Sequence, residues 1–399
     1  MTLASIGTYL PPWGTPEARV AGADEDALTM AVEAGRAALA ASGVERVDRV
    51  VLVTRDLPLL EGGNSRALIA GLGLGSGVGV VEQVGGAPAT LDALLSAERG
   101  TLVLGADVPT GPGSGAGAAL VGDGDGTSFG PARRVQRSLP VRARGRDGRV
   151  HDYDDPRLMR ERGTRAAIEE AGVTGKAVAA VGLSARDAAA LCEGDAPRVP
   201  TSGASAPLFA LAALADARRS GLLLAFEHGM LTAADVVSAG TPVMRIELEP
   251  QPMPTTRATP GPDIRISLAA YGRAFEVKVR LEAGRCSHCG TLALPPRRRC
   301  LGCGSEGGAD LVELPRDAVV YTSTTVHTPV PGIPTPYTIV IVDLGDSGVR
   351  LLAQVTGAPA GHVHIGDRGQ MVLRRVAIRS GVPDYGYAFA PSRAPESVR

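Results

Sequence analysis

Four of the five cysteines lie in two short motifs, which constrain the fold more than any other feature. The motifs are Cys286-Ser-His-Cys289 and Cys300-Leu-Gly-Cys303, and a glycine follows each one. Two such hairpins supply four thiolates, the tetrahedral ligand set that zinc prefers, and the glycines let the backbone turn tightly beneath the metal. A redox dithiol pair is the alternative, but two motifs at ribbon spacing favour zinc. Because four ligands leave no open coordination position, the sequence predicts one structural zinc.

The composition is that of an ordinary globular protein. The chain has 399 residues, a formal net charge of −1 and 44% hydrophobic residues, which is enough for two or three domains with buried cores. We find no long apolar run and no basic segment followed by an apolar one, the patterns of a membrane span and a signal peptide. A reducing compartment fits zinc thiolates. We therefore expect a cytoplasmic protein without membrane contact.

Short apolar runs alternate with alanine-rich helical segments over residues 1–246. Val50 to Val53 is apolar and bounded by charged residues, as expected of a buried strand, and Asp24 to Ala41 repeats apolar residues at helical spacing. A second series of strands and helices follows the arginine-rich stretch 141–163. This alternation predicts a mainly parallel sheet flanked by helices.

The rest of the chain predicts three further parts after residue 248. Five prolines between positions 250 and 262 exclude a helix or a central strand, so 249–263 should be an extended linker. Apolar residues at helical spacing predict a helix over 264–283, and the cysteine motifs place a zinc ribbon at 284–313. Several β-rich runs separated by turn signals predict a small barrel over 314–392.

Nucleic acid is the partner that a ribbon next to such a barrel could suggest. The near-neutral charge and the 3% aromatic content argue against it, because single-strand binders use basic grooves and stacking aromatic residues. Salt-dependent affinity for single strands would mark this alternative.

Several stretches around the cysteine motifs form a specific pattern. Leu294-Pro295-Pro296-Arg297 lies between the motifs, and Tyr321-Thr322-Ser323-Thr324-Thr325-Val326-His327 and Leu351-Leu352-Ala353-Gln354-Val355-Thr356-Gly357 follow them. Residues 264–392 thereby resemble the zinc-ribbon/OB-fold family of acyl-CoA-associated proteins. Members of that family typically accompany a thiolase-type enzyme, and they help to form an acyl-CoA path or an assembly surface.

The N-terminal part contains a second pattern. It comprises Ile6-Gly7-Thr8-Tyr9-Leu10-Pro11-Pro12, Asn64-Ser65-Arg66-Ala67-Leu68-Ile69 and Ala119-Leu120-Val121-Gly122-Asp123-Gly124. These stretches resemble the hydroxymethylglutaryl-CoA synthase and ketoacyl synthase branch of the thiolase superfamily. The resemblance implies a thiolase-like domain over 1–248, with two similar halves at about 1–130 and 131–248. It also implies a five-layer α/β sandwich and a homodimer formed through this domain.

The resemblance also shows which functional groups are missing. Enzymes of that superfamily use a cysteine nucleophile, assisted by a histidine and by an asparagine or second histidine. By the resemblance these positions fall at Ala87, Ser184 and Pro200. Alanine cannot act as a nucleophile and proline offers no side-chain donor. The resemblance therefore implies a pseudoenzyme, with no catalytic residue in this chain.

An unusual nucleophile is the alternative. Cys192 is the remaining thiol, although a cysteine after an alanine-rich helix is more often a small core residue. Ser202 or Ser205 would need a nearby base, and His228 is the imidazole to consider. With one of these groups, the chain would be a stand-alone acyltransferase or a hydroxymethylglutaryl-CoA synthase-like enzyme.

These observations lead to one functional expectation. The chain would be a non-catalytic subunit of an acyltransferase complex, in which a separate thiolase-type enzyme performs Claisen or retro-Claisen chemistry. This subunit would contribute assembly and access for acyl-CoA or an acyl carrier. Arg297, Arg298 and Arg299 could meet CoA phosphates or an acidic partner surface, although arginine is abundant throughout the chain and a solvated surface explains them equally well.

Overall fold

The computed structural model describes residues 2–43, 46–123, 125–137, 139, 142–144, 149–153, 155–261, 265 and 267–392. Gly124 and Ile264, which belong to segments considered above, lie outside the described residues. The chain forms two compact units. The first comprises Met1–Ala21, Met30–Ser65 and Gly77–Pro250, and the second comprises Gly22–Thr29, Arg66–Ser76 and Gln251–Arg399.

The strands up to residue 250 are short, and many are buried. They are β1 (Thr2–Leu10), β2 (Trp13–Thr15), β3 (Ala18–Val20), β4 (Arg49–Thr54), β5 (Gly79–Val84), β6 (Thr101–Asp107), β7 (Gly115–Gly122), β8 (Ser128–Phe129), β9 (Arg133–Val135), β10 (Arg142–Arg144), β11 (Val150–Asp152), β12 (Ala179–Val181), β13 (Gly221–Glu227), β14 (Met230–Val237) and β15 (Val243–Glu247). The helices are α1 (Ala27–Ser42), α2 (Ser65–Gly71), α3 (Ala87–Leu95), α4 (Pro156–Leu158), the π-helical η1 (Met159–Arg165), α5 (Ala166–Glu170), α6 (Ala185–Leu191) and α7 (Ala206–Ala217).

Most strands of the first unit join one mixed sheet, which has 11 strands within the described residues. Its order is β12-β13-β14-β8-β1-β7-β6-β4-β5, with β15 beside β1 and β9 beside β14. β4 is parallel to β5 and β6, whereas β7 is antiparallel to β1 and β6, and β14 is antiparallel to β13. The prediction of a mainly parallel sheet is therefore wrong. β7 and β14 each follow the preceding strand after a short connection, which permits only antiparallel pairing.

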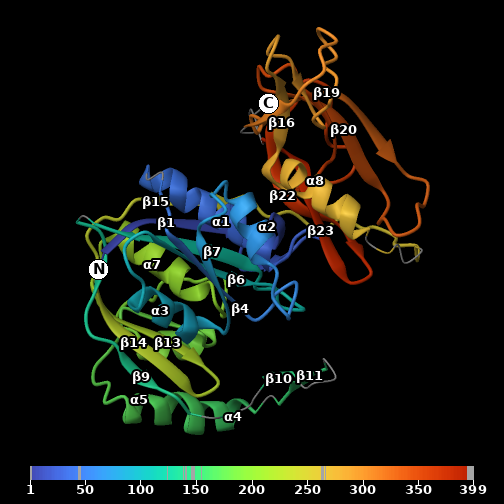
Figure 1. Cartoon of the computed structure of the whole chain (residues 1–399). Coiled ribbons are helices and arrows are strands. Elements are labelled where there is room, and N and C mark those ends of the chain that lie inside the picture. Colours follow the sequence, from blue (N-terminus) through green and yellow to red (C-terminus); the bar gives the residue numbers. More distant parts are fainter. Residues whose placement is uncertain are drawn as a thin grey trace, which may run out of the picture. The chain divides into compact units, whose positions relative to one another are not determined.

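Helices α3 and α7 lie between the two parts of this sheet (Figure 1). α3 packs against β4 and β6 on one side and against β13 and β14 on the other, while α7 packs against β1, β7 and β12. On the outer faces, Ser5 of β1 donates a hydrogen bond to the carbonyl of Ala38 in α1, and α5 covers β14. The order is thus helix, sheet, helices, sheet, helix. This confirms the five-layer thiolase-like sandwich expected from the sequence.

Strand β13 shows why the layers form. Leu223 and Ala225 belong to the core around α3 and α7, whereas Leu224 and Phe226 belong to a second core under α5 and α6. Successive side chains of a strand point to opposite faces, so a strand covered on both sides needs a continuous apolar run. α7 is apolar around nearly its whole circumference, as a helix in a middle layer must be.

We predict that Leu208→Ala in α7 destabilises the first unit by about 2–5 kcal/mol, because it leaves a cavity in the central layer. Leu208 is fully buried, and a side chain at Gly117 would stand only 2.5 Å from its Cβ. Urea unfolding followed by circular dichroism measures the change. Leu60, which is 57% exposed, provides the control, since Leu60→Ala should alter stability by less than about 0.5 kcal/mol. Equal effects of the two substitutions would contradict the layer assignment.

Among the described residues after position 250, the structure has one long helix and two small sheets. The elements are α8 (Leu268–Arg280), β16 (Glu282–Cys286), β17 (Leu292–Ala293), β18 (Ala309–Glu313), β19 (Asp317–Val326), β20 (Tyr337–Leu344), β21 (Arg350–Gln354), β22 (Arg368–Arg379) and β23 (Val382–Pro391). The ribbon strands have the order β17-β16-β18, and the other sheet has the order β21-β20-β19-β22-β23. A parallel bridge between Val355 and Phe389 closes this second sheet into a barrel. No helix among the described residues is long and apolar enough to cross a membrane.

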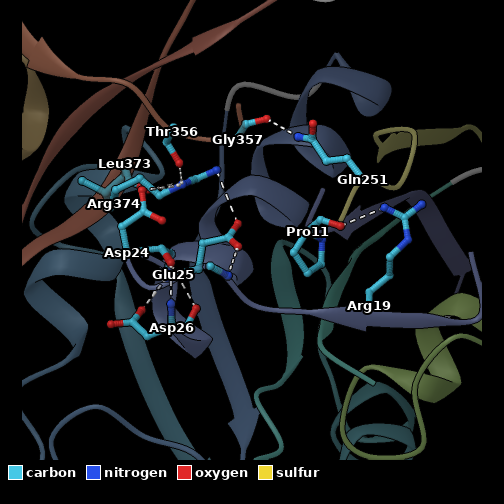
Figure 2. A network of polar contacts seen from close by, with 12 residues as sticks. Pro11, Arg19, Asp24, Glu25, Asp26, Gln251, Thr356, Gly357, Leu373 and Arg374 are labelled. Atoms are coloured by element: carbon cyan, nitrogen blue, oxygen red, sulfur yellow. Dashed lines mark hydrogen bonds and ion pairs between the residues drawn. The ribbon is translucent and has the colours of Figure 1, made fainter. Parts of the chain in front are cut away.

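A buried ionic network lies within the second unit. Figure 2 shows the guanidinium of Arg374, which is only 4% exposed, reaching toward Glu25 and Thr356. Its Nη2 lies 3.5 Å from Glu25 Oε1, and its Nε donates to Thr356 Oγ1 at 3.4 Å. The neighbouring Asp26 accepts a hydrogen bond of 2.9 Å from the hydroxyl of Tyr385. Arg374 and Glu25 thus neutralise each other, as buried charges require, while a hydrogen bond holds Asp26.

We predict that Asp26→Asn changes how stability depends on pH. Burial raises the pKa of Asp26, against the hydrogen bond from the Thr29 amide and the charge of Arg375. Above pH 3.8 the unfolded carboxyl ionises, while the folded one keeps its proton up to its raised pKa. Wild-type stability should therefore fall relative to Asp26→Asn as the pH rises through that window. Urea midpoints of both proteins, taken at a series of pH values upward from 3.8, measure the difference. A difference in urea midpoint that stays constant with pH would contradict the raised pKa of Asp26.

Candidate functional site

The four cysteines of the two motifs come together in the ribbon. The sulfurs of Cys286, Cys289, Cys300 and Cys303 all lie within 4.8 Å of one another. The Sγ atoms of Cys289 and Cys300 are 3.5 Å apart, and those of Cys286 and Cys303 are 3.9 Å apart. Zinc–sulfur bonds of about 2.3 Å in a tetrahedron give sulfur–sulfur edges of about 3.8 Å. The cysteines therefore fit one structural zinc ion.

The local backbone turns in the same way at both motifs. Gly290 donates a hydrogen bond to the carbonyl of Cys286 at 2.9 Å, and Gly304 donates to the carbonyl of Cys300 at 3.1 Å. Both glycines have positive φ, +76° and +73°, which few other residues adopt without strain. A hydrogen bond from Ser305 lowers the pKa of the Cys286 thiol to about 5. This favours the thiolate form that a metal ligand needs.

We predict one zinc per chain, lost when a ligand is removed. Cys300→Ser should abolish stoichiometric zinc, whereas Cys192→Ser, at a cysteine outside the ribbon, should keep it. A colorimetric chelator assay on protein washed free of excess metal measures the content. Zinc should also leave as the pH is lowered, because protons compete for the thiolates. Retention of full zinc by Cys300→Ser would contradict the assignment.

The three arginines of the ribbon remain exposed. The carbonyl of Arg298 accepts a hydrogen bond of 3.2 Å from Gly307, and Arg299 pairs through its backbone with Glu306. Arg297 lies beside Arg298 in the same loop. Exposed guanidinium groups of this kind are open to an anionic ligand, so contact with CoA phosphates or with a partner stays a prediction.

At the position expected for a cysteine nucleophile, Ala87 begins helix α3 and is buried. A carboxylate from another strand occupies the space in front of this helix. Oε2 of Glu227, at the end of β13, accepts a hydrogen bond of 2.7 Å from the amide of Gly86. Oε1 of the same side chain pairs with Arg55. Glu227 is 8% exposed, so a buried and neutralised charge lies where the reactive thiol would be expected.

The second central helix has an equivalent arrangement. Asp107, at the end of β6, accepts hydrogen bonds from the amides of Ala204 and Ser205 at 2.7 and 2.8 Å, in front of α7. Burial raises the pKa of Asp107, against the hydrogen bonds from Ser205. The fully buried Ser205 hydroxyl also donates to Asp107, and the hydroxyl oxygen of Thr201 lies 2.7 Å from it. Ser205 is therefore held by a carboxylate and a hydroxyl, not by the imidazole that a nucleophilic serine uses.

Among the other groups considered from the sequence, Ser184 and Cys192 flank α6, whereas His228 lies beside Glu227. Ser184 is the exposed N-cap of α6, where its hydroxyl accepts from the Asp187 amide, and Ser202 is exposed. Cys192 belongs to the core under α5 and α6, and burial raises the pKa of its thiol. His228 has a positive φ of 47°, and its Nε2 lies 4.0 Å from Glu227 Oε1. Pro200 is half-buried and offers no donor.

Sequence reasoning missed the charged residues that fill the two helix ends. Glu227 and Asp107 each end a strand that is otherwise apolar, and Arg55 directly follows another. A charged residue at the end of a buried strand is the sequence signal that could have identified them, because strand ends meet helix N-termini in layered α/β folds. The sequence could not say which helix each carboxylate would reach.

Family models match the C-terminal part of the chain in two places. The rubredoxin-like zinc ribbon domain of ChsH2 matches residues 278–307, and the C-terminal OB-fold domain of ChsH2 matches residues 311–374. The C-terminal part thus contains a ChsH2-type zinc ribbon and OB-fold domain. This confirms the ribbon and the OB-like barrel predicted from the sequence. No curated protein matches the chain.

Three solved structures illustrate what the chain resembles. The 3-oxoacyl-[acyl-carrier-protein] synthase III of Aquifex aeolicus is 17% identical over 59% of this chain and 99% of its own, with a TM-score of 0.46. The priming β-ketosynthase of the R1128 polyketide pathway is 22% identical over 60% of this chain and 96% of its own, with a TM-score of 0.47. The Ltp2–ChsH2(DUF35) aldolase structure has a chain that is 29% identical over 33% of this chain and 98% of its own, with a TM-score of 0.26. The layer order described above, and not these scores, identifies the fold of the first unit.

Proposed function

We propose that this chain is a non-catalytic subunit of a thiolase-type acyltransferase complex. A separate enzyme with an intact cysteine would form or break the carbon–carbon bond of an acyl-CoA or acyl-carrier substrate. This chain would contribute assembly through its thiolase-like domain, and substrate access through its ribbon and OB barrel. The complex would work in the cytoplasm, and two copies of the chain would pair through the thiolase-like domain.

The observation that carries the proposal is the filled N-terminus of α3. Thioester chemistry in this fold needs a nucleophile at that helix end and donors for the developing oxyanion. Here Ala87 has no reactive group, and the Gly86 amide already donates to Glu227. Because Arg55 pairs with that same carboxylate, the cation that could bind a substrate anion is also engaged.

A groove in the second unit supports the substrate-access part of the proposal. It has a volume of about 780 Å³ and runs beside α8 and β21. Leu281, Leu311, Leu352 and Val376 line it, and Arg273 adds a cation. Leu352 is 65% exposed and Leu311 is 50% exposed, so the groove presents an apolar patch of the kind that marks interaction sites. An apolar groove with a cation in its lining suits an acyl or pantetheine chain attached to a phosphorylated head group.

The stand-alone acyltransferase alternative receives no support from the described residues. Cys192 is buried with a raised pKa, and a reactive thiol needs a lowered one. Ser205 is fully buried and donates to Asp107.

The first test is a native mass spectrum of the tagged chain purified from its own host cells. We expect a stoichiometric complex with a thiolase-type protein that has an intact cysteine. The purified complex should cleave or condense acyl-CoA thioesters, and substitution of the partner's cysteine should abolish the activity. A matched substitution in this chain, Cys192→Ser, should leave the activity unchanged.

Two results would contradict the proposal. One is a homo-oligomer without any such protein under conditions that preserve known complexes. The other is a covalent acyl adduct on the isolated chain after incubation with acyl-CoA, detected by intact-mass analysis, which would favour the stand-alone enzyme.

A further inference from the structure

The N-terminus of α3 has the chemistry of an anion site. Helix α3 has nine residues, and its N-cap, Gly86, has no side chain with which to satisfy the first amides. These unpaired amides carry a partial positive charge, which attracts carboxylates. Arg55 adds a full positive charge beside the Gly86 amide. A carboxylate there receives one backbone N–H and one guanidinium, a donor set that binds carboxylates well.

Gly86 is what lets a carboxylate come so close. A Cβ added to this residue would stand 2.8 Å from Glu227 Oε2, 2.9 Å from Glu227 Cδ and 3.0 Å from Arg55 Nη2. Its φ of −111° is negative, and these close contacts exclude a side chain at this position. The pocket is therefore shaped around a carboxylate group.

The charges that face this position are few. Arg55 pairs with Glu227, and the His228 imidazole lies 4.0 Å from the same carboxylate. Asp107 also interacts electrostatically with Arg55, and its own hydrogen bonds come from Ala204 and Ser205. One carboxylate in front of α3 thus balances the charge of Arg55. A second anion would meet no free cation among these groups.

We infer that the N-terminus of α3 together with Arg55 is a binding site for a small carboxylate, which the chain fills with its own Glu227. The ligand belongs to β13, a strand on the far side of α3 from the strand that precedes Arg55. The site is therefore closed from within, and the side chain that closes it also links the two halves of the sandwich. This inference does not depend on the proposed function, because it concerns only how the helix end is occupied.

The test is chemical rescue of Glu227→Ala. This substitution removes two carbons and two oxygens, the heavy atoms of acetate, and leaves Arg55 and the Gly86 amide without their partner. We expect the melting temperature of the first unit to fall by about 6 °C or more, since breaking a buried ion pair is costly. Sodium acetate should restore part of the loss in a saturable manner. Sodium chloride at equal ionic strength and neutral acetamide should not.

Three matched proteins complete the experiment. Glu227→Ala combined with Arg55→Met should show no acetate rescue, because the cation is gone. Asp216→Ala, which removes a carboxylate that is 54% exposed, should neither lose much stability nor respond to acetate. Glu227→Gln keeps the shape of the side chain without its charge. Its melting temperature should therefore lie below that of wild type and should not respond to acetate.

The inference fails if acetate and chloride act equally on Glu227→Ala, or if that variant melts like wild type. If Glu227→Ala does not fold, the melting temperature of Glu227→Gln tests the inference instead. A wild-type value for Glu227→Gln would show that no negative charge is needed at the start of α3. The readout is thermal stability, so a failure here leaves the partner-subunit proposal standing, and the reverse also holds.

Discussion

The fold of the first unit depends on satisfying two helix N-termini that lie between the parts of one sheet. Amides at the start of a buried helix have no water to donate to, so another group must accept from them. For α3 this group is Glu227, and for α7 it is Asp107, each from the last residue of a strand. Each carboxylate thus joins a strand of one half to a helix of the other. Arg55 pairs with Glu227 and also acts on Asp107.

The same arrangement links the structure to the proposed function. An enzyme of this architecture must leave its central helix ends open to substrate. Such an open site lowers the stability of the fold. In this chain both ends are filled by internal carboxylates, and Ala87 has no group to present. Under the proposed function, the sandwich would contribute stability and assembly, while the zinc ribbon and the barrel would supply the surfaces that contact substrate.

The sequence predicted the parts of this protein that have local patterns. Cysteine spacing predicted the zinc ligands, because C-x-x-C hairpins are formed by nearby residues. Alternating apolar segments predicted a sheet flanked by helices, and the resemblance to the thiolase superfamily implied the sandwich. Neither gave the antiparallel partners β7 and β14, whose direction is decided by short connections. The pairing of Glu227 with Gly86 joins residues 141 positions apart, so no local pattern could reveal it. The same is true of Arg374, whose partners near Glu25 lie at the other end of the chain.

The pairing of β1 with β15 has a consequence for how the protein is made. Ile6 to Leu10 align in parallel with Val243 to Glu247, and β8 joins β1 to β14 through only two residues. A ribosome releases β1 first, yet Ile6 to Leu10 lack a partner on one edge of that strand until nearly 250 residues have been synthesised. Pairings over such distances form slowly, and an unpaired strand edge can recruit other chains meanwhile. Newly made chains should therefore need protection from aggregation until residue 247 has emerged.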